Sequence, residues 1–159
     1  AVTGWRLGYI AAPIEISKAC QKIQSQFTSG TNVITQRAAI DALLMDPTEI
    51  MLERKKIFNK RRDFICEGLK SIDGIEISIP DGAFYVFPDV SSFFGKKSGT
   101  TLIENSQDVS TVLLQDFHLG STPGHAFGAQ GYIRLSYAAS DRDLEQAIEK
   151  IKAFAGSLK

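Results

Sequence analysis

The sequence has few cysteines and no excess of charge of either sign, and both features exclude whole classes of protein. Its 159 residues include two cysteines, Cys20 and Cys66, which lie far apart and have no histidine or second cysteine at a metal-ligand spacing. We therefore expect a reduced protein without a metal site. Lysine and arginine together number 18, as do aspartate and glutamate, so the net charge is zero. This balance argues against nucleic acid as a partner.

Long apolar runs are also missing from the chain. A membrane-spanning helix needs roughly 18 consecutive apolar residues, and no segment approaches that length or resembles a signal peptide. The expectation is a cytoplasmic protein with no membrane partner. Because 43% of the residues are hydrophobic and 23% are charged, as in ordinary globular proteins, we expect a packed core and not disorder.

The first half of the chain has patterns typical of helices. It begins Ala1-Val2-Thr3-Gly4-Trp5-Arg6 without an initiator methionine, which predicts a piece of a longer protein. Asp46-Pro47-Thr48-Glu49 is a strong helix start, and no breaker follows before Gly68. The expected elements are a buried strand over 5–12, a helix over 13–27 that buries one stripe, a break over 28–32, a helix over 33–45, and a long helix from Asp46 toward Ile72. Within the break, Ser29 and Thr31 are candidates for a helix cap or a phosphate contact, and the cap is favoured. Such a long helix is typical of a connector between two bodies.

The second half changes to strand patterns. Residues 132–138 alternate cleanly, so Tyr132, Arg134 and Ser136 share one face while Ile133, Leu135 and Tyr137 share the other. We expect a hairpin of 75–79 with 83–90, followed by a mobile loop over 91–106. A helix near 109–117, strands over 119–122 and 132–138, and a helix from Ser140 to Gly156 are expected after it. The fold class predicted is α/β, with a small β-β-α-β-β-α domain of α+β type whose mainly antiparallel sheet is covered by helices.

Two arginines are the strongest candidates for chemistry. Arg6 lies between Gly4 and Gly8 in an otherwise apolar segment, and Arg134 lies in the middle of a strand. A guanidinium is always charged and needs an anion when it leaves water, so each position favours a phosphate or carboxylate ligand. The alternatives are an ion pair with a carboxylate elsewhere in the fold for Arg6, and a solvent-facing arginine for Arg134.

Other polar residues carry weaker signals. His118 and His125 have no serine, cysteine or carboxylate at a catalytic spacing. The basic run 54–62 is flanked by Glu53 and Asp63, and the net charge of the chain is zero, which favours a solvated helix face. Lys96-Lys97 lacks the spacing of a phosphate-binding loop.

Three motifs in order resemble the C-terminal half of the class I/II aminotransferases of the aspartate aminotransferase family. They are Thr3-Gly4-Trp5-Arg6-Leu7-Gly8-Tyr9, Pro80-Asp81-Gly82-Ala83-Phe84-Tyr85 continuing to Asp89, and Tyr132-Ile133-Arg134-Leu135-Ser136-Tyr137-Ala138. The loop Pro123-Gly124-His125-Ala126-Phe127-Gly128 is similar to the one that precedes the last strand of that family. The resemblance covers essentially the whole chain and implies the fold type I architecture.

The resemblance implies a reaction and a role for each arginine. The family transfers an amino group from an amino acid to a 2-oxo acid with pyridoxal 5'-phosphate as cofactor. By resemblance, Arg6 binds the cofactor phosphate and Arg134 binds the substrate carboxylate. The longer protein is expected to be a homodimer, in which residues 1–66 end the large domain and residues 67–159 form the small domain.

The resemblance also implies what this chain lacks. In the family, the lysine that forms a Schiff base with the cofactor closely precedes the first motif, so it is expected upstream of Ala1. Neither Lys18 nor Lys22 matches it, because both follow Arg6. We therefore predict no catalytic residue within the chain, no cofactor binding by the chain alone and no activity. Gly30 replaces a family asparagine next to Ser29, which leaves a ligand contact at Ser29 open.

Two alternative functions remain open from the sequence. A carbon–sulfur β-lyase or an aminocyclopropane-carboxylate synthase on the same cofactor scaffold would share both arginines. A non-catalytic interaction domain is the alternative of a different class. The side-chain specificity of the substrate is not determined by these motifs.

Overall fold

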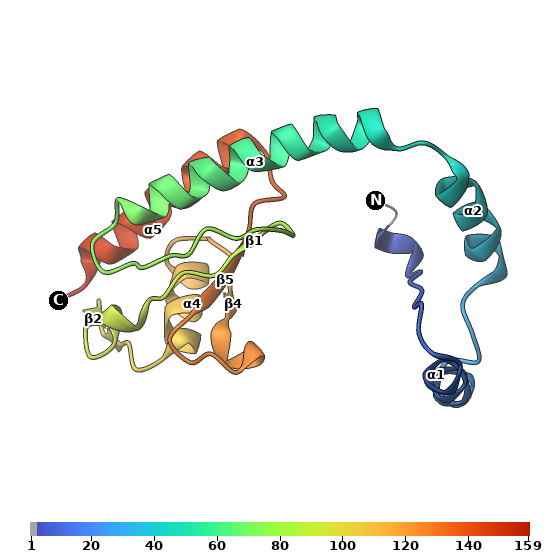
Figure 1. Ribbon diagram of the computed structural model, residues 1–159. Coiled ribbons are helices and arrows are strands. Elements are labelled where there is room, and N and C mark those ends of the chain that lie inside the picture. The colour runs from blue at the N-terminus through green and yellow to red at the C-terminus, as the bar shows by residue number, and fades with distance from the viewer. Residues whose placement is uncertain (1–2) are drawn as a thin grey trace. The chain divides into compact units, whose positions relative to one another are not determined.

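The computed structural model describes residues 3–159, and its Cα positions divide into two compact units (Figure 1). The first unit is Ala1–Ile50 and the second is Met51–Lys159. The first two residues of the opening motif region, Ala1 and Val2, lie outside the described residues. The α/β fold class predicted from the sequence is confirmed, with helices and small antiparallel sheets.

The first unit is helical. A 3-10 turn, η1 (Thr3–Trp5), is followed by an irregular segment and then by α1 (Ile14–Phe27) and α2 (Val33–Leu44). Pro13 precedes the first turn of α1, where its missing N–H costs no hydrogen bond. Asn32 caps α2, because its side-chain oxygen accepts from the backbone nitrogens of Ile34 at 2.9 Å and Thr35 at 3.3 Å.

Three expectations for the first unit are wrong. The segment 5–12 is not a strand, because no described backbone pairs with it in a ladder. The apolar stripe of α1 is not buried, and Phe27 is 83% exposed, since none of residues 3–50 is buried by the rest of the described chain. The cap of α2 is Asn32 and not Ser29 or Thr31.

The long helix α3 (Thr48–Lys70) begins where the sequence predicts. Asp46 Oδ1 accepts hydrogen bonds from both the backbone nitrogen of Thr48, at 3.0 Å, and its hydroxyl, at 2.6 Å. These bonds satisfy groups that a helix start leaves without intrahelical partners. Toward its C-terminal end α3 buries Ile65, Cys66 and Leu69 in the second unit.

A three-stranded antiparallel sheet, in the order β1-β5-β4, organises the second unit. β5 (Ile133–Ser136) is central and pairs with β1 (Tyr85–Val86) on one side and β4 (Thr122–Pro123) on the other. The alternation predicted for β5 is confirmed, since Ile133, Leu135 and Tyr137 are buried. A separate hairpin joins β2 (Lys97–Ser98) to β3 (Thr101–Leu102).

Two helices complete the second unit. α4 (Ser106–Gln115) starts with an Asn105 capping box, and α5 (Asp141–Ser157) is capped by Ser140. α3 and α5 run alongside each other (Figure 1), and the Asp141 carboxylate pairs with Arg61 Nε at 2.9 Å and Lys60 Nζ at 3.2 Å. The buried stripe of α5 consists of Leu144, Ile148, Ile151 and Phe154, and it joins the apolar residues of α3, α4 and the sheet in one core.

Two expectations for the second unit need correction. Residues 75–79 and 83–90 do not form a regular hairpin, because only Glu76 and Asp89 bridge them. Pro80 has no N–H to extend that pairing, and β1 pairs with β5 instead. The predicted loop 91–106 contains η2 (Ser91–Phe93) and the β2–β3 hairpin, and it is anchored by the buried side chains of Phe93 and Ile103.

Candidate functional site

Arg134 lies at the middle of the central strand β5, on the face opposite the core. Its cross-strand partner on β4 is Thr122. On the other side, Tyr85 of β1 pairs with Ser136, which lies two residues after Arg134 on the same face of β5. Side chains directly opposite and diagonal to one another on a sheet face lie within reach of long and aromatic groups. The register therefore brings Tyr85 beside Arg134, although 49 positions separate them in the sequence.

The Arg134 guanidinium contacts two aromatic rings. Its Cζ atom lies over the Tyr85 ring at 4.3 Å from the centroid and over the Phe127 ring at 4.6 Å. Among residues 3–159, no carboxylate lies within 4.0 Å of it and no acceptor takes a hydrogen bond from it. Contact through ring faces uses π-electron density, so the N–H donors remain available for a planar anion.

The turn η3 (Gly124–Phe127) brings Phe127 to the site. Gly124 N donates to the carbonyl of Tyr132 at 2.7 Å, and a Cβ at Gly124 would lie 2.2 Å from the carbonyl oxygen of Ala129. Only glycine fits this close approach of two backbones. Gly128 then ends the turn with a left-handed backbone, φ 76°.

Two further aromatic residues extend this face. Phe87 stacks on Tyr132 with ring centroids 5.1 Å apart and meets Phe127 edge-on at 6.0 Å. The negative charge of Asp89 raises the pKa of Tyr132, so Tyr132 stays a neutral phenol near pH 7.

Arg6 belongs to the first unit, and its side chain is exposed. It follows η1, where its backbone N donates to the carbonyl of Thr3 at 3.3 Å and its Nη1 lies 3.5 Å from the same oxygen. Its backbone is left-handed, with φ 52°, a conformation that a residue with a Cβ adopts only at a cost. Within residues 3–159 no carboxylate pairs with Arg6. Its positive charge is therefore available to an anion.

The structure gives no catalytic or binding arrangement to His118, His125 or Ser29 among the described residues. His118 serves through its backbone, since its carbonyl accepts from Lys150 Nζ at 2.9 Å. His125 lies exposed within η3. Ser29 has a left-handed backbone, φ 62°, in the break before α2. Within the described chain no group of three or more His, Cys, Asp or Glu side chains is arranged to hold a metal ion, and no helix is long and apolar enough to cross a membrane.

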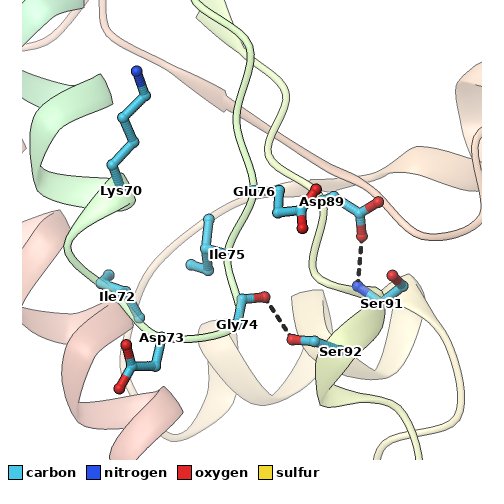
Figure 2. Close-up of a pocket in the computed structure, with 9 residues that line it drawn as sticks. All are labelled: Lys70, Ile72, Asp73, Gly74, Ile75, Glu76, Asp89, Ser91 and Ser92. Atoms are coloured by element: carbon cyan, nitrogen blue, oxygen red, sulfur yellow. Dashed lines mark hydrogen bonds between the residues drawn. The ribbon is translucent and has the colours of Figure 1, made fainter.

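A separate polar pocket of about 460 Å³ opens where the chain leaves α3 (Figure 2). Three carboxylates line it, from Asp73, Glu76 and Asp89, and Lys70 lies at its edge. The Asp89 carboxylate accepts from the backbone nitrogen of Ser91 at 2.8 Å, and its backbone bridges Glu76 and Tyr132. Asp89 thus stabilises the backbone of the segments around the pocket.

The sequence singled out Arg134 but missed the rings beside it. Tyr85 belongs to the motif of residues 80–89 and Phe127 to the loop motif of residues 123–128, but neither motif indicates a role for its ring. The available signal was the two-residue period of 85 and 87, which puts two aromatic rings on one strand face. Arg6 and Arg134 fall in different units of the chain.

Comparison with known proteins identifies relatives of the chain. The family model "Aminotransferase class I and II" matches residues 1–151. A bifunctional aspartate aminotransferase and glutamate/aspartate-prephenate aminotransferase of Petunia hybrida is 46% identical over 155 residues, which are 96% of this chain and 32% of that protein.

Solved structures of aspartate aminotransferases are similar as well. The enzyme from Rhizobium meliloti superimposes with a TM-score of 0.88 at 39% identity, over 99% of this chain and 40% of that one. The Thermus thermophilus enzyme with maleate gives 0.81 at 33% identity, over 97% of this chain and 38% of that one. The chain thus spans roughly a third to two fifths of the length of these relatives. It belongs to the class I and II aminotransferase family.

Proposed function

We propose that this chain is the C-terminal part of a pyridoxal-phosphate-dependent aminotransferase that transfers an amino group from an amino acid to a 2-oxo acid. Membership of the family supports the proposal, as do relatives named for aspartate aminotransfer. The observation that carries it is the Arg134 guanidinium, which lies on the open face of the central strand with no anion among the described residues to pair it.

Arg134 binds the substrate carboxylate in this proposal. Both substrates of the reaction carry a carboxylate next to the reacting carbon, and a guanidinium can bind a carboxylate through two parallel N–H···O bonds. The Thermus relative with maleate is a complex with a dicarboxylate, which supports an anion of this kind. Binding through two bonds also orients the reacting carbon, since a bidentate ion pair restricts rotation of the substrate.

Arg6 is the residue of this chain that fits the cofactor phosphate. Its charge is permanent, its side chain is exposed and no described carboxylate pairs with it. Gly4 and Gly8 on either side leave open space where a Cβ would lie, so a bulky anion can approach the backbone. When bound, pyridoxal phosphate supplies an electron-withdrawing ring that makes the proton on the α-carbon of the amino acid acidic.

We propose that the lysine of the family mechanism is none of the lysines of this chain. Arg6 follows that lysine in the family motif, whereas Lys18 and Lys22 come after Arg6. The chain by itself is then inactive. The test is to incubate the purified chain with pyridoxal phosphate and borohydride and to locate any label by mass spectrometry. We expect no stoichiometric labelled site, and one specifically labelled lysine would contradict this part of the proposal.

The activity itself is tested on the longest natural polypeptide that contains residues 1–159. We expect amino transfer from an amino acid that depends on added 2-oxo acid, with loss of activity in Arg134→Ala. Release of pyruvate and thiol without a 2-oxo acid would instead identify a β-lyase. Absence of both activities in a protein that starts at its own methionine near Ala1 would favour an interaction domain.

We further propose that the longer protein is a homodimer. Apolar side chains of α1 and α2 are exposed, with Ile34 at 75% and Leu44 at 80%, and such a surface needs a cover. The rest of the longer protein and a second subunit would supply it together. Light scattering of the purified longer protein tests this. The division into a large-domain part, 1–66, and a small domain, 67–159, and the cytoplasmic location stay predictions from the sequence.

A further inference from the structure

The rings of Tyr85 and Phe127 hold the Arg134 guanidinium from two different segments of the second unit. Tyr85 comes from β1 and Phe127 from the turn η3, and both contact the same Cζ atom, at 4.3 Å and 4.6 Å. An arginine side chain has many rotamers, and fixing it costs conformational entropy. Two ring contacts restrict these rotamers before any anion arrives.

Phe127 is placed where the core does not explain it. Its side chain is 48% exposed, whereas the rings that build the core, such as Phe93 and Phe154, are almost fully buried. The aromatic contacts of Phe127 are with Arg134 and the edge of Phe87. A half-exposed phenylalanine gains little free energy from burial within this unit, and its ring instead contacts the Arg134 guanidinium.

The turn that carries Phe127 is constrained by its backbone. Gly124 N donates to Tyr132 O at 2.7 Å, and Ala129 N donates to Gly124 O at 3.0 Å. The first bond attaches η3 to the residue just before β5, the strand that holds Arg134, and the second closes the turn onto its own start. The ring and the guanidinium are thus fixed to one another through the main chain.

We propose that Tyr85 and Phe127 are positioning residues, which hold the Arg134 guanidinium in the orientation that binds the substrate carboxylate. This inference rests on the proposed function, because it assigns the carboxylate to Arg134. The rings contribute through their faces and leave every N–H donor of the guanidinium to the ligand. The ring itself is what matters, so the phenol oxygen of Tyr85 is dispensable.

The test uses the longest natural polypeptide that contains this chain, loaded with cofactor, and maleate as a non-reacting carboxylate probe. We expect Phe127→Leu and Tyr85→Leu to raise the inhibition constant of maleate and the substrate KM about three- to tenfold, with kcat changed less than twofold. Tyr85→Phe and Phe127→Tyr, which keep a ring, should match the wild type. Phe117→Leu is the control, because its half-buried ring contacts Phe154 and not Arg134.

A merely structural role is excluded by combining variants. In an Arg134→Ala background, Phe127→Leu should add no further increase in the inhibition constant. An unchanged constant in both leucine variants, or the same additional increase without Arg134, would overturn the positioning role. If Arg134→Ala alone leaves maleate binding unchanged, the proposed function itself fails, so the two failures are distinguishable. Because Phe127 is half exposed, its leucine variant keeps the core intact.

Discussion

Tyr137 Oη donates a hydrogen bond to the carbonyl oxygen of Ala83, 3.0 Å away, across 54 positions of sequence. Ala83 has a left-handed backbone, φ 60°, which is unfavourable for a residue with a Cβ. Tyr137 N also donates to Phe84 O at 2.9 Å. The residue that follows β5 therefore fixes the turn that leads into β1 and Tyr85.

Removing this hydroxyl should lower stability by a small amount. Tyr137→Phe loses one hydrogen bond but keeps the buried ring, so we expect the free energy of unfolding to fall by about 1 kcal/mol. Urea unfolding followed by circular dichroism measures it. Tyr85→Phe is the matched control, since no described group bonds to its hydroxyl. Equal midpoints for the two variants would show that the Tyr137 bond contributes nothing.

Gly124 should not tolerate a methyl group. In Gly124→Ala the new Cβ would lie 2.2 Å from Ala129 O and 2.5 Å from Tyr132 O, so the backbone must move, at a cost of about 1–3 kcal/mol. The same movement displaces Phe127, so weaker maleate binding should accompany the loss. At Gly120 a Cβ meets nothing within 4 Å, and Gly120→Ala should be neutral on both measurements. Similar stability of the two variants would contradict the close packing of η3.

The two cysteines should differ sharply in reactivity. Cys20 is exposed, whereas Cys66 is buried, and burial raises the pKa of its thiol. Because the thiolate is the reacting form, we expect iodoacetamide at pH 8 to label Cys20 within minutes and Cys66 only after unfolding in urea. Peptide mass spectrometry with and without urea distinguishes the two sites. Rapid labelling of Cys66 in the folded chain would show that the end of α3 is not packed as described.

The Asp141 ion pair should make part of the stability depend on pH. Hydrogen bonds from Arg61 and Lys60 hold the pKa of Asp141 below its ordinary value of 3.8. A carboxyl whose pKa is lowered on folding stabilises the fold above pH 3.8, and this contribution is lost as the pH falls through the folded-state pKa. Since the Asp141 side chain is 54% exposed, the effect should be small and weaken in salt.

Asp141→Asn isolates that contribution. We expect a lower unfolding midpoint than the wild type at pH 6, a smaller difference in about 1 M sodium chloride, and a difference that shrinks as the pH falls below 3.8. Asp81→Asn, at an exposed position without an ion pair among the described residues, should match the wild type at every pH. A difference that persists unchanged at pH 3 would assign the effect of Asp141→Asn to something other than its charge.

Local signals in the sequence predicted the helices well. The caps at Asp46 and Ser140 and the alternation of 132–138 depend on neighbouring residues only, and the structure confirms all three. The segment 5–12 has the composition of a strand, but a strand also needs a partner backbone, which the described chain does not supply. Composition alone therefore could not predict whether residues 5–12 form a strand.

The candidate site was predictable only in part for a similar reason. A permanent charge in mid-strand identifies Arg134 from its neighbours alone. Tyr85 and Phe127 reach it through the β1–β5 register and the η3 turn, which are pairings between distant segments. No local sequence pattern encodes such a pairing, so the contacts of the two rings with Arg134 could not be predicted from the sequence.

Whether Arg134 binds the substrate carboxylate is decided by the inhibition constant of maleate for the cofactor-loaded longer protein, measured for the wild type and for Arg134→Ala. If Arg134 binds the substrate carboxylate, truncation should raise that constant about a hundredfold, and Arg134→Lys should recover only part of the loss because it lacks the planar fork. An inhibition constant unchanged by Arg134→Ala, in a variant that remains folded by circular dichroism, would show that Arg134 does not bind the substrate carboxylate.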